Sequence, residues 1–233
     1  MEKLDKGKIM YLRNLKGLKF PDVAVIKFFF KMGLHTRQNQ KVLELACSNG
    51  NNLALFANYD YECVGVDFDS MSIKNANYNF KEVIKAKSFS FFCENIFDFV
   101  SHNKNLNNDI LLMPNVVNYF KREDFLKLLK LCKENRLYKK DAVFFLRTRS
   151  IKDYRYGLGK KIAHNSFLIT EDETTGEKGC INTLYQEYEL VEYLKEYLGL
   201  YDFKVLNYES TNVMGEDERL VTNSDIVIYG KIQ

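Results

Sequence analysis

Two acidic residues, each close to the end of an apolar run, carry the clearest chemical signal in this sequence. Glu44 lies in the run 41–47, and Asp67 ends a second run at 64–67. Small residues follow the first acid at alternate positions: Ala46, Ser48 and Gly50. An apolar strand, a small-residue turn, a helix and a second strand make a βαβ unit, which brings both acids to one edge of a sheet. Nucleoside-like cofactors bind at such an edge, so the pattern predicts an enzyme.

The small residues of this turn are explained by the close approach of the backbone to the ligand. The backbone must pass within contact distance of the ligand, and a side chain larger than that of alanine would keep the two apart. Ala46 and Ser48 preserve the clearance provided that neither position needs a positive φ.

The elements that must position these residues alternate along the chain. Proline and aspartate open a helix over 20–32, and apolar spacing of i, i+3, i+4 and i+7 predicts another over 122–135. Further helices are predicted at 51–57, 70–80 (with Asp69 and Ser70 as its cap) and 187–198. Predicted strands are 41–47, 62–68, 88–93, 109–113, 142–146, 203–208 and 224–232. A polar loop at 214–223 would make the last two strands antiparallel neighbours, so the sequence predicts a doubly wound α/β fold.

Composition bounds the class of protein. The chain has 233 residues, 46% of them hydrophobic, which suits a single domain with one well-packed core. Its net charge of +3 gives no sign of polyanion binding. Five scattered cysteines favour a reducing compartment, and the first residues lack the apolar stretch of a signal peptide, so a cytoplasmic protein away from membranes is expected. The acids, histidines and cysteines show no metal-ligand spacing, so no metal is expected.

The order of elements resembles the class I S-adenosylmethionine-dependent methyltransferases of small-molecule type, over roughly 20–232. These have a Rossmann-like sheet of seven mostly parallel strands, with the last one antiparallel and inserted beside the fifth, and helices on both faces. Their first loop follows the pattern Glu-x-Gly-x-Gly-x-Gly. Here the acid, Glu44, and the last glycine, Gly50, match, whereas Ala46 and Ser48 stand where glycine is usual.

The resemblance implies S-adenosylmethionine as cofactor and S-adenosylhomocysteine as product. Asp67 would accept hydrogen bonds from both ribose hydroxyls, a task that suits a carboxylate. Asn95 and Ile96 would lie beside the adenine, with Glu94 as a rival for the polar role, and Asn115 would lie under the sulfonium. The predicted cofactor-binding residues are Glu44, Ala46, Ser48, Gly50, Asn52, Asp67, Phe68, Asn95, Ile96 and Asn115.

The segment 108–120 resembles a fourth family strand followed by the pattern Asn-Val-x-x-Tyr-Phe, in which Asn118 and Tyr119 face the acceptor. It lacks the Asn/Asp-Pro-Pro-aromatic tetrapeptide of enzymes that methylate adenine or glutamine amide nitrogens. A small molecule is therefore the expected partner, and nucleic acid is not.

Two segments are expected to flank the site within a single methyltransferase domain spanning 1–233. Residues 1–33 would form a helical lid at the entrance, and 147–185 an insertion on the acceptor side. The insertion begins with residues suited to phosphate, carboxylate or a nucleotide-linked sugar: Arg147, Arg149, Tyr154, Arg155 and Tyr156. Arginines of a solvated loop are the alternative reading. His164 is a candidate general base beside Tyr119 as a second catalytic residue, and a solvated loop histidine is again the alternative.

The leading hypothesis is an S-adenosylmethionine-dependent methyltransferase that acts on a small anionic acceptor, such as a sugar or sugar nucleotide, by in-line displacement onto oxygen. The alternative within the same fold is a methyltransferase-like enzyme that detoxifies a small molecule or metalloid, whose soft nucleophilic atom would need no general base. An NAD-type oxidoreductase is a different class, although Gly-x-Gly-x-x-Gly is missing after the first strand. A non-catalytic methyltransferase-like module is a third possibility, left open by Ala46 and Ser48.

Overall fold

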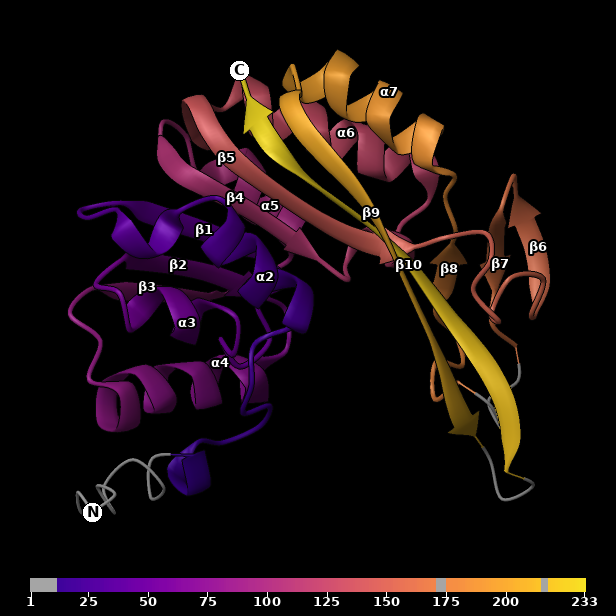
Figure 1. Ribbon diagram of the computed structural model, residues 1–233, viewed down its shortest axis with the longest axis horizontal. Coiled ribbons are helices and arrows are strands. Elements are labelled where there is room, and N and C mark those ends of the chain that lie inside the picture. Colours follow the sequence, from indigo (N-terminus) through magenta and orange to yellow (C-terminus); the bar gives the residue numbers. More distant parts are fainter. Residues whose placement is uncertain (1–11, 171–174, 215–217) are drawn as a thin grey trace.

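The computed structural model describes residues 12–170, 175–214 and 218–233, and its centre is a seven-stranded sheet of order β3-β2-β1-β4-β5-β10-β9 (Figure 1). Its strands are β1 (Lys41–Leu45), β2 (Glu62–Asp67), β3 (Phe89–Cys93), β4 (Asn108–Pro114), β5 (Tyr138–Arg149), β9 (Tyr201–Met214) and β10 (Arg219–Ile232). Strands β1 to β5 pair in parallel, and β10 is antiparallel to both β5 and β9. The predicted fold class, with a late antiparallel strand beside the fifth, is confirmed.

Helices cover both faces of this sheet (Figure 1). One face carries α2 (Val23–Lys31), α3 (Leu53–Ala57) and α4 (Ser70–Tyr78). The other carries α5 (Ile96–His102), α6 (Arg122–Glu134) and α7 (Glu187–Leu198). Among the described helices, none combines the length and apolar character needed to cross a membrane.

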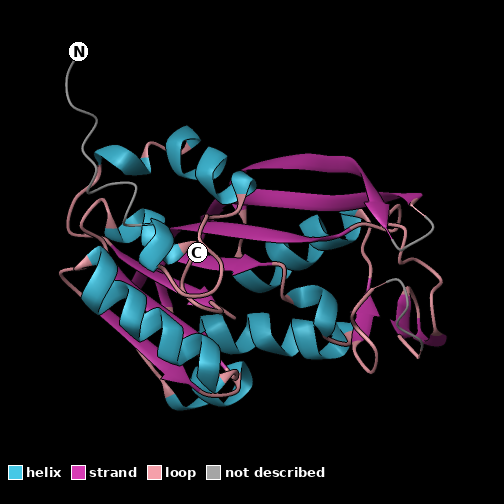
Figure 2. Cartoon of the chain, turned by 90° about the horizontal axis from the view of Figure 1, so that it is seen from below, coloured by secondary structure: helices cyan, strands magenta, loops and turns pink. Residues whose placement is uncertain are grey.

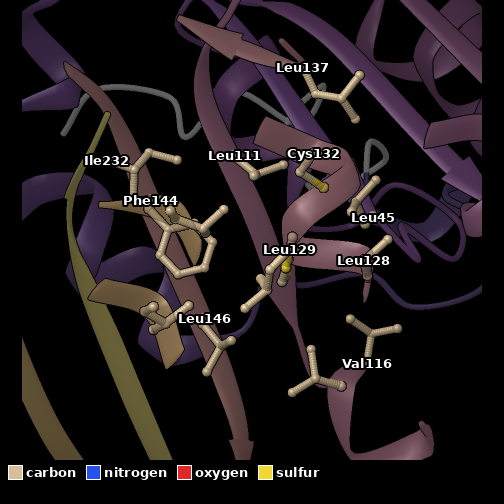
Figure 3. Packing of buried hydrophobic residues seen from close by; sticks show 14 of the residues in the cluster. Leu45, Leu111, Val116, Leu128, Leu129, Cys132, Leu137, Phe144, Leu146 and Ile232 are labelled. Atoms are coloured by element: carbon tan, nitrogen blue, oxygen red, sulfur yellow. The ribbon is translucent and has the colours of Figure 1, made fainter. Parts of the chain in front are cut away.

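Each face has its own buried core because the central strands are apolar on both sides, as parallel strands between two helix layers must be. In the core beneath α5, α6 and α7, Leu111 and Phe144 of the sheet pack towards Leu128, Leu129 and Cys132 of α6 (Figure 3). The i, i+1 and i+4 positions of these α6 residues put them on one stripe of the helix. This packing fixes the sheet on which the functional residues stand.

Local capping agrees with the sequence. The Asp22 carboxylate accepts the Ala24 N–H at 2.7 Å and caps α2, and Asp69 accepts the Ser72 N–H at 2.9 Å and caps α4. Asp69 is therefore the N-cap of α4, and Ser70 is the first helical residue. The end of α4 continues as a π-helical turn, Asn79–Ile84.

Two predicted boundaries were wrong. The fifth strand is longer than 142–146, so that Arg147 and Arg149 lie inside it. Met214 and residues 219–223 of the predicted polar loop 214–223 lie in strands, because β9 and β10 pair as far as Met214 and Arg219. The two paired strands project past the body of the sheet (Figure 1). Both faces of a projecting hairpin meet water, so polar residues there are compatible with strand structure and hide the alternation.

The segment 147–185 shows no long periodic run, yet it folds into a second, three-stranded sheet. Its strands are β6 (Lys160–Ala163), β7 (Ser166–Leu168) and β8 (Ile181–Thr183). The small sheet lies beyond one end of the large sheet (Figure 2). Strands of three or four residues are too short for a periodic signal.

Candidate cofactor and acceptor site

Glu44 is buried in β1 and hydrogen-bonded on one side only. Its side chain is almost wholly inaccessible, and its Oε1 accepts the Asn52 Nδ2 hydrogen at 2.7 Å. Its Oε2 has no hydrogen-bond partner among the described residues. Burial raises the pKa of Glu44 to about 8, with the charges of Asp67 and Asp22 acting in the same direction. The site thus holds a buried acid with a free acceptor atom.

Asp67 is the last residue of β2 and anchors the loop that follows β1. Its Oδ2 accepts the Ser48 N–H at 2.8 Å, and its Oδ1 accepts the Asp69 N–H at 3.0 Å. Each carboxylate oxygen can accept a further hydrogen bond. Asp67 therefore joins the ends of two adjacent parallel strands, as predicted for the βαβ unit.

The loop itself is strained at the two positions where the sequence departs from glycine. Ala46 and Ser48 have φ of 61° and 47°, both in the left-handed region, and Gly50 follows with 75°. Alanine and serine would fit this loop without cost only if neither position had a positive φ, and both positions have one. Gly50 also has no room for a side chain, because a Cβ at this position would lie 2.9 Å from the Phe80 ring.

Three asparagines of this loop hold the segment that precedes α2, and the sequence did not reveal this. The Asn49 amide accepts the Leu18 N–H and donates to the Lys16 and Leu18 carbonyls. The Asn51 amide donates to the Phe20 carbonyl at 3.0 Å, and Asn52 accepts the Asp22 N–H at 2.8 Å. Both ends of the Asn52 amide are thus engaged within the protein, between Glu44 and Asp22. The repeated asparagines at 49, 51 and 52 were the available signal.

Two adjoining cavities open at this edge of the sheet, of about 540 Å³ and about 750 Å³. The smaller is lined by Leu18, Phe20, Asp22, Glu44, Cys47, Asn51, Asn52 and Pro114, and the larger by Asp67, Phe68, Asn95, Ile96, Phe120, Glu177 and Ile181 among others. Ala46, Ser48, Asn115 and Tyr119 line both. The structure therefore brings nine of the ten predicted cofactor residues to the walls of one continuous space, and Gly50 lies in the loop behind it.

Asn95 and Asn115 have partners within the protein. Asn95 caps α5, since its Oδ1 accepts the Phe97 N–H at 2.9 Å. Asn115 directly follows β4 with φ of 54°, and its Nδ2 donates to Asp22 Oδ2 at 3.2 Å. The cap leaves the Asn95 amide nitrogen as the group available to a ligand.

Tyr119 lies where the two cavities meet and is tied to the insertion. Its hydroxyl donates to Glu177 Oε1 at 3.1 Å and accepts a longer, 3.4 Å contact from Arg149. Burial raises the pKa of Tyr119, against the opposing charge of Arg149. Arg149 donates two hydrogen bonds to Glu177, from Nη1 to Oε2 at 2.8 Å and from Nη2 to Oε1 at 2.5 Å. Glu177 was not among the predicted residues, because no motif marks it.

The three arginines predicted to bind the acceptor, Arg147, Arg149 and Arg155, are all ion-paired, and none of them lines either cavity. Arg147 pairs with Asp22 and Asp225, and Arg155 pairs with the buried Asp153 at 3.0 Å. The ring of Tyr154 lies 4.3 Å from the Arg155 guanidinium carbon, and the Tyr156 hydroxyl donates to Asn165. Each of these arginines thus faces a carboxylate of the protein.

His164 lies outside both cavities. It is in the turn between β6 and β7, its side chain is 69% exposed, and its ring contacts Asn165 and Glu189. The structure thus places it as the solvated loop histidine of the alternative reading. Within the described residues, no group of histidine, cysteine, aspartate and glutamate could hold a metal ion.

Comparisons with known proteins agree with this geometry. Residues 43–146 match the sequence family described as a methyltransferase domain. No curated protein matches the chain. A crystal structure of a SAM-dependent methyltransferase from Methanosarcina mazei is 18% identical and superposes with a TM-score of 0.62, over 87% of this chain and 98% of that one.

Two further solved structures are similar. TehB from Haemophilus influenzae is 14% identical with a TM-score of 0.66, over 97% of this chain and 67% of that one. A putative methyltransferase from Bacillus halodurans is 14% identical with a TM-score of 0.60, over 91% and 98%. Residues 43–146 therefore match a methyltransferase domain by sequence, and the chain has, over most of its length, the fold of solved S-adenosylmethionine-dependent methyltransferases.

Proposed function

We propose that this protein transfers the methyl group of S-adenosylmethionine to an oxygen of a small anionic acceptor, such as a sugar, sugar nucleotide or similar metabolite. One observation carries the proposal: the two cavities meet at Ala46, Ser48, Asn115 and Tyr119, at the carboxyl ends of the parallel strands. An elongated cofactor can span this junction, with space remaining beyond it for an acceptor.

The residues present suit the charge of this cofactor. Asp22 and Glu44 line the smaller cavity, and Glu44 Oε2 is buried with no hydrogen-bond partner among the described residues, so an ammonium group would be bound there. Asp67 would accept the ribose hydroxyls, and Phe68 and Ile96 would provide apolar walls for the adenine. Asn95 Nδ2 would donate to a ring nitrogen of the base. When bound, S-adenosylmethionine supplies an electrophilic methyl group on a sulfonium.

The larger cavity extends past the junction towards Glu177 and Ile181, and we assign this part to the acceptor. Tyr119 keeps its proton near neutral pH, because its pKa is raised, and its hydroxyl would orient the acceptor. Burial works to raise the pKa of Glu177, but the hydrogen bonds and charge of Arg149 outweigh it and hold that pKa below its ordinary value. Neither residue readily takes up a proton near neutral pH, so an acceptor oxygen that is already ionised fits best.

Calorimetric titration with S-adenosylhomocysteine tests the proposal. We expect saturable binding, an affinity lowered by at least about tenfold in Asp67→Asn because a charge-assisted hydrogen bond is lost, and no binding of NADH. Asp60→Asn is the matched control, since Asp60 is exposed and paired with Lys87 on the surface. Failure to bind S-adenosylhomocysteine at high micromolar concentration would overturn the assignment.

A screen for the acceptor follows from the same binding site. Small phosphates, carboxylates and sugar nucleotides are mixed with S-adenosylmethionine, and release of S-adenosylhomocysteine is measured. We expect release with an anionic acceptor, and turnover restricted to uncharged acceptors would contradict the proposed class.

A further inference from the structure

A charged contact beside the acceptor cavity joins a strand and a loop. Arg149 projects from β5, and Glu177 belongs to the loop that joins β7 to β8. Two nitrogens of the guanidinium hold both carboxylate oxygens, and the Tyr119 hydroxyl donates to the same carboxylate. This is the paired fork by which arginine recognises a free carboxylate.

Two buried donors beside this pair lack partners. Arg155 Nε has no hydrogen-bond partner within the described part of the chain, and Glu177 Oε2 is 3.6 Å away, beyond hydrogen-bond distance. Asn182 accepts from Arg149 through Oδ1, while its Nδ2 is equally unpartnered although the side chain is almost fully buried. Unsatisfied buried donors are costly. The Glu177 carboxylate therefore leaves Arg155 Nε and Asn182 Nδ2 without a hydrogen bond among the described residues.

Glu177 differs from Asp153, the other acid of this cluster, in its place in the fold. Asp153 is buried, and its two oxygens accept the Arg155 and Ser224 backbone N–H groups, so it is fixed in place. Glu177 sits between Gly176 and Gly179, with φ of 68° and 85°, and a Cβ at either glycine would meet no atom within 4 Å. Glycines in open space allow the loop to change its backbone angles.

We propose that Glu177 occupies, in the acceptor-free protein, the binding site for a carboxylate of the acceptor. An acceptor carboxylate would replace it on Arg149 and Tyr119 and would also reach the Arg155 donor that Glu177 leaves unsatisfied. The displaced Glu177 carboxylate would then lie outside the Arg149 fork. The inference rests on the proposed function and narrows its acceptor to molecules that carry a carboxylate.

The experiment measures binding of propionate, which has the carboxyl end of a glutamate side chain, to the full chain saturated with S-adenosylhomocysteine. Saturation-transfer NMR gives the affinity for the parent, Glu177→Ala and Glu177→Gln. We expect both variants to bind propionate at least about tenfold more tightly than the parent, since the charge-assisted contacts become free. Glu134→Gln, an exposed change on α6, should leave the affinity unaltered.

A second substitution assigns the gain to the arginine. In Arg149→Ala/Glu177→Ala the tighter binding should disappear. Equal propionate affinity in the parent and both Glu177 variants, or a gain that survives loss of Arg149, would overturn the inference. A gain for inorganic phosphate without one for propionate would also overturn it, because the carboxylate class would be wrong. Binding of S-adenosylhomocysteine is recorded in each sample, so failure of the cofactor assignment is seen separately.

Discussion

The strained loop after β1 offers a direct test of how the sequence departs from its family. Ala46 adopts φ of 61°, in a region that disfavours a non-glycine residue by about 1–2 kcal/mol. Glycine removes this strain but adds freedom to the unfolded chain, which costs about 0.5–1 kcal/mol. Ala46→Gly should therefore be as stable as the parent protein or more stable. The backbone keeps its course, so its affinity for S-adenosylhomocysteine should not change.

Ala54→Gly is the matched control, because Ala54 is also half-buried but lies in helix α3. Glycine within a helix lowers stability by about 1 kcal/mol relative to alanine. The unfolded-state contribution is the same in both variants, so urea unfolding should separate them by about 1–2 kcal/mol, with Ala46→Gly the more stable. If the two variants unfold at the same urea concentration, the left-handed backbone at Ala46 is not strained and the reasoning fails.

Three further predictions concern the same site. The pKa of Glu44 is about 8 in the folded protein, so the folded protein keeps a proton that the unfolded chain releases above about pH 4.5. Relative to Glu44→Gln, the free energy of unfolding of the parent should therefore fall by about 1 kcal/mol per pH unit between about pH 4.5 and 8. Parallel pH curves of urea unfolding for the two proteins would contradict this. Asp22→Ala should lower the free energy of unfolding by about 1–3 kcal/mol in chemical denaturation, since it removes a helix cap and one Arg147 partner, whereas Asp60→Ala should not. Tyr119→Phe should lower turnover roughly tenfold while S-adenosylhomocysteine affinity stays constant, and a parallel loss of affinity would assign Tyr119 to the cofactor instead.

Much of the fold could be predicted because its signals are local. The apolar runs, Pro21 with Asp22, and the stripe of α6 each lie within a few consecutive residues, and the predicted helix 187–198 has the bounds of α7. The small sheet of the insertion could not be found in this way. Its strands have three or four residues each, too few to show a pattern of their own, and they are held by pairing with one another.

The cofactor side of the site was more predictable than the acceptor side for the same reason. Glu44 and Asp67 stand at strand ends, where topology alone brings them together. The arginines were recognised by their residue type. The partners of Arg147 and Arg149 lie 28 or more residues away in the sequence, so these ion pairs could not be predicted from it. Part of the predicted N-terminal lid, residues 1–11, lies outside the described residues.

The position of β10 has a consequence for how the protein is assembled. This strand comes after β9 along the chain but lies between β5 and β9, pairing Ala142 with Ile232 and Tyr201 with Lys231. Strand β9 joins the sheet through β10, so the sheet cannot grow past β5 until residues 219–232 have been synthesised and have closed a loop of some seventy or more residues. The edge of β5 stays open during synthesis, and with it Arg147 and Arg149. The acceptor side is therefore expected to be the last part of the protein to form.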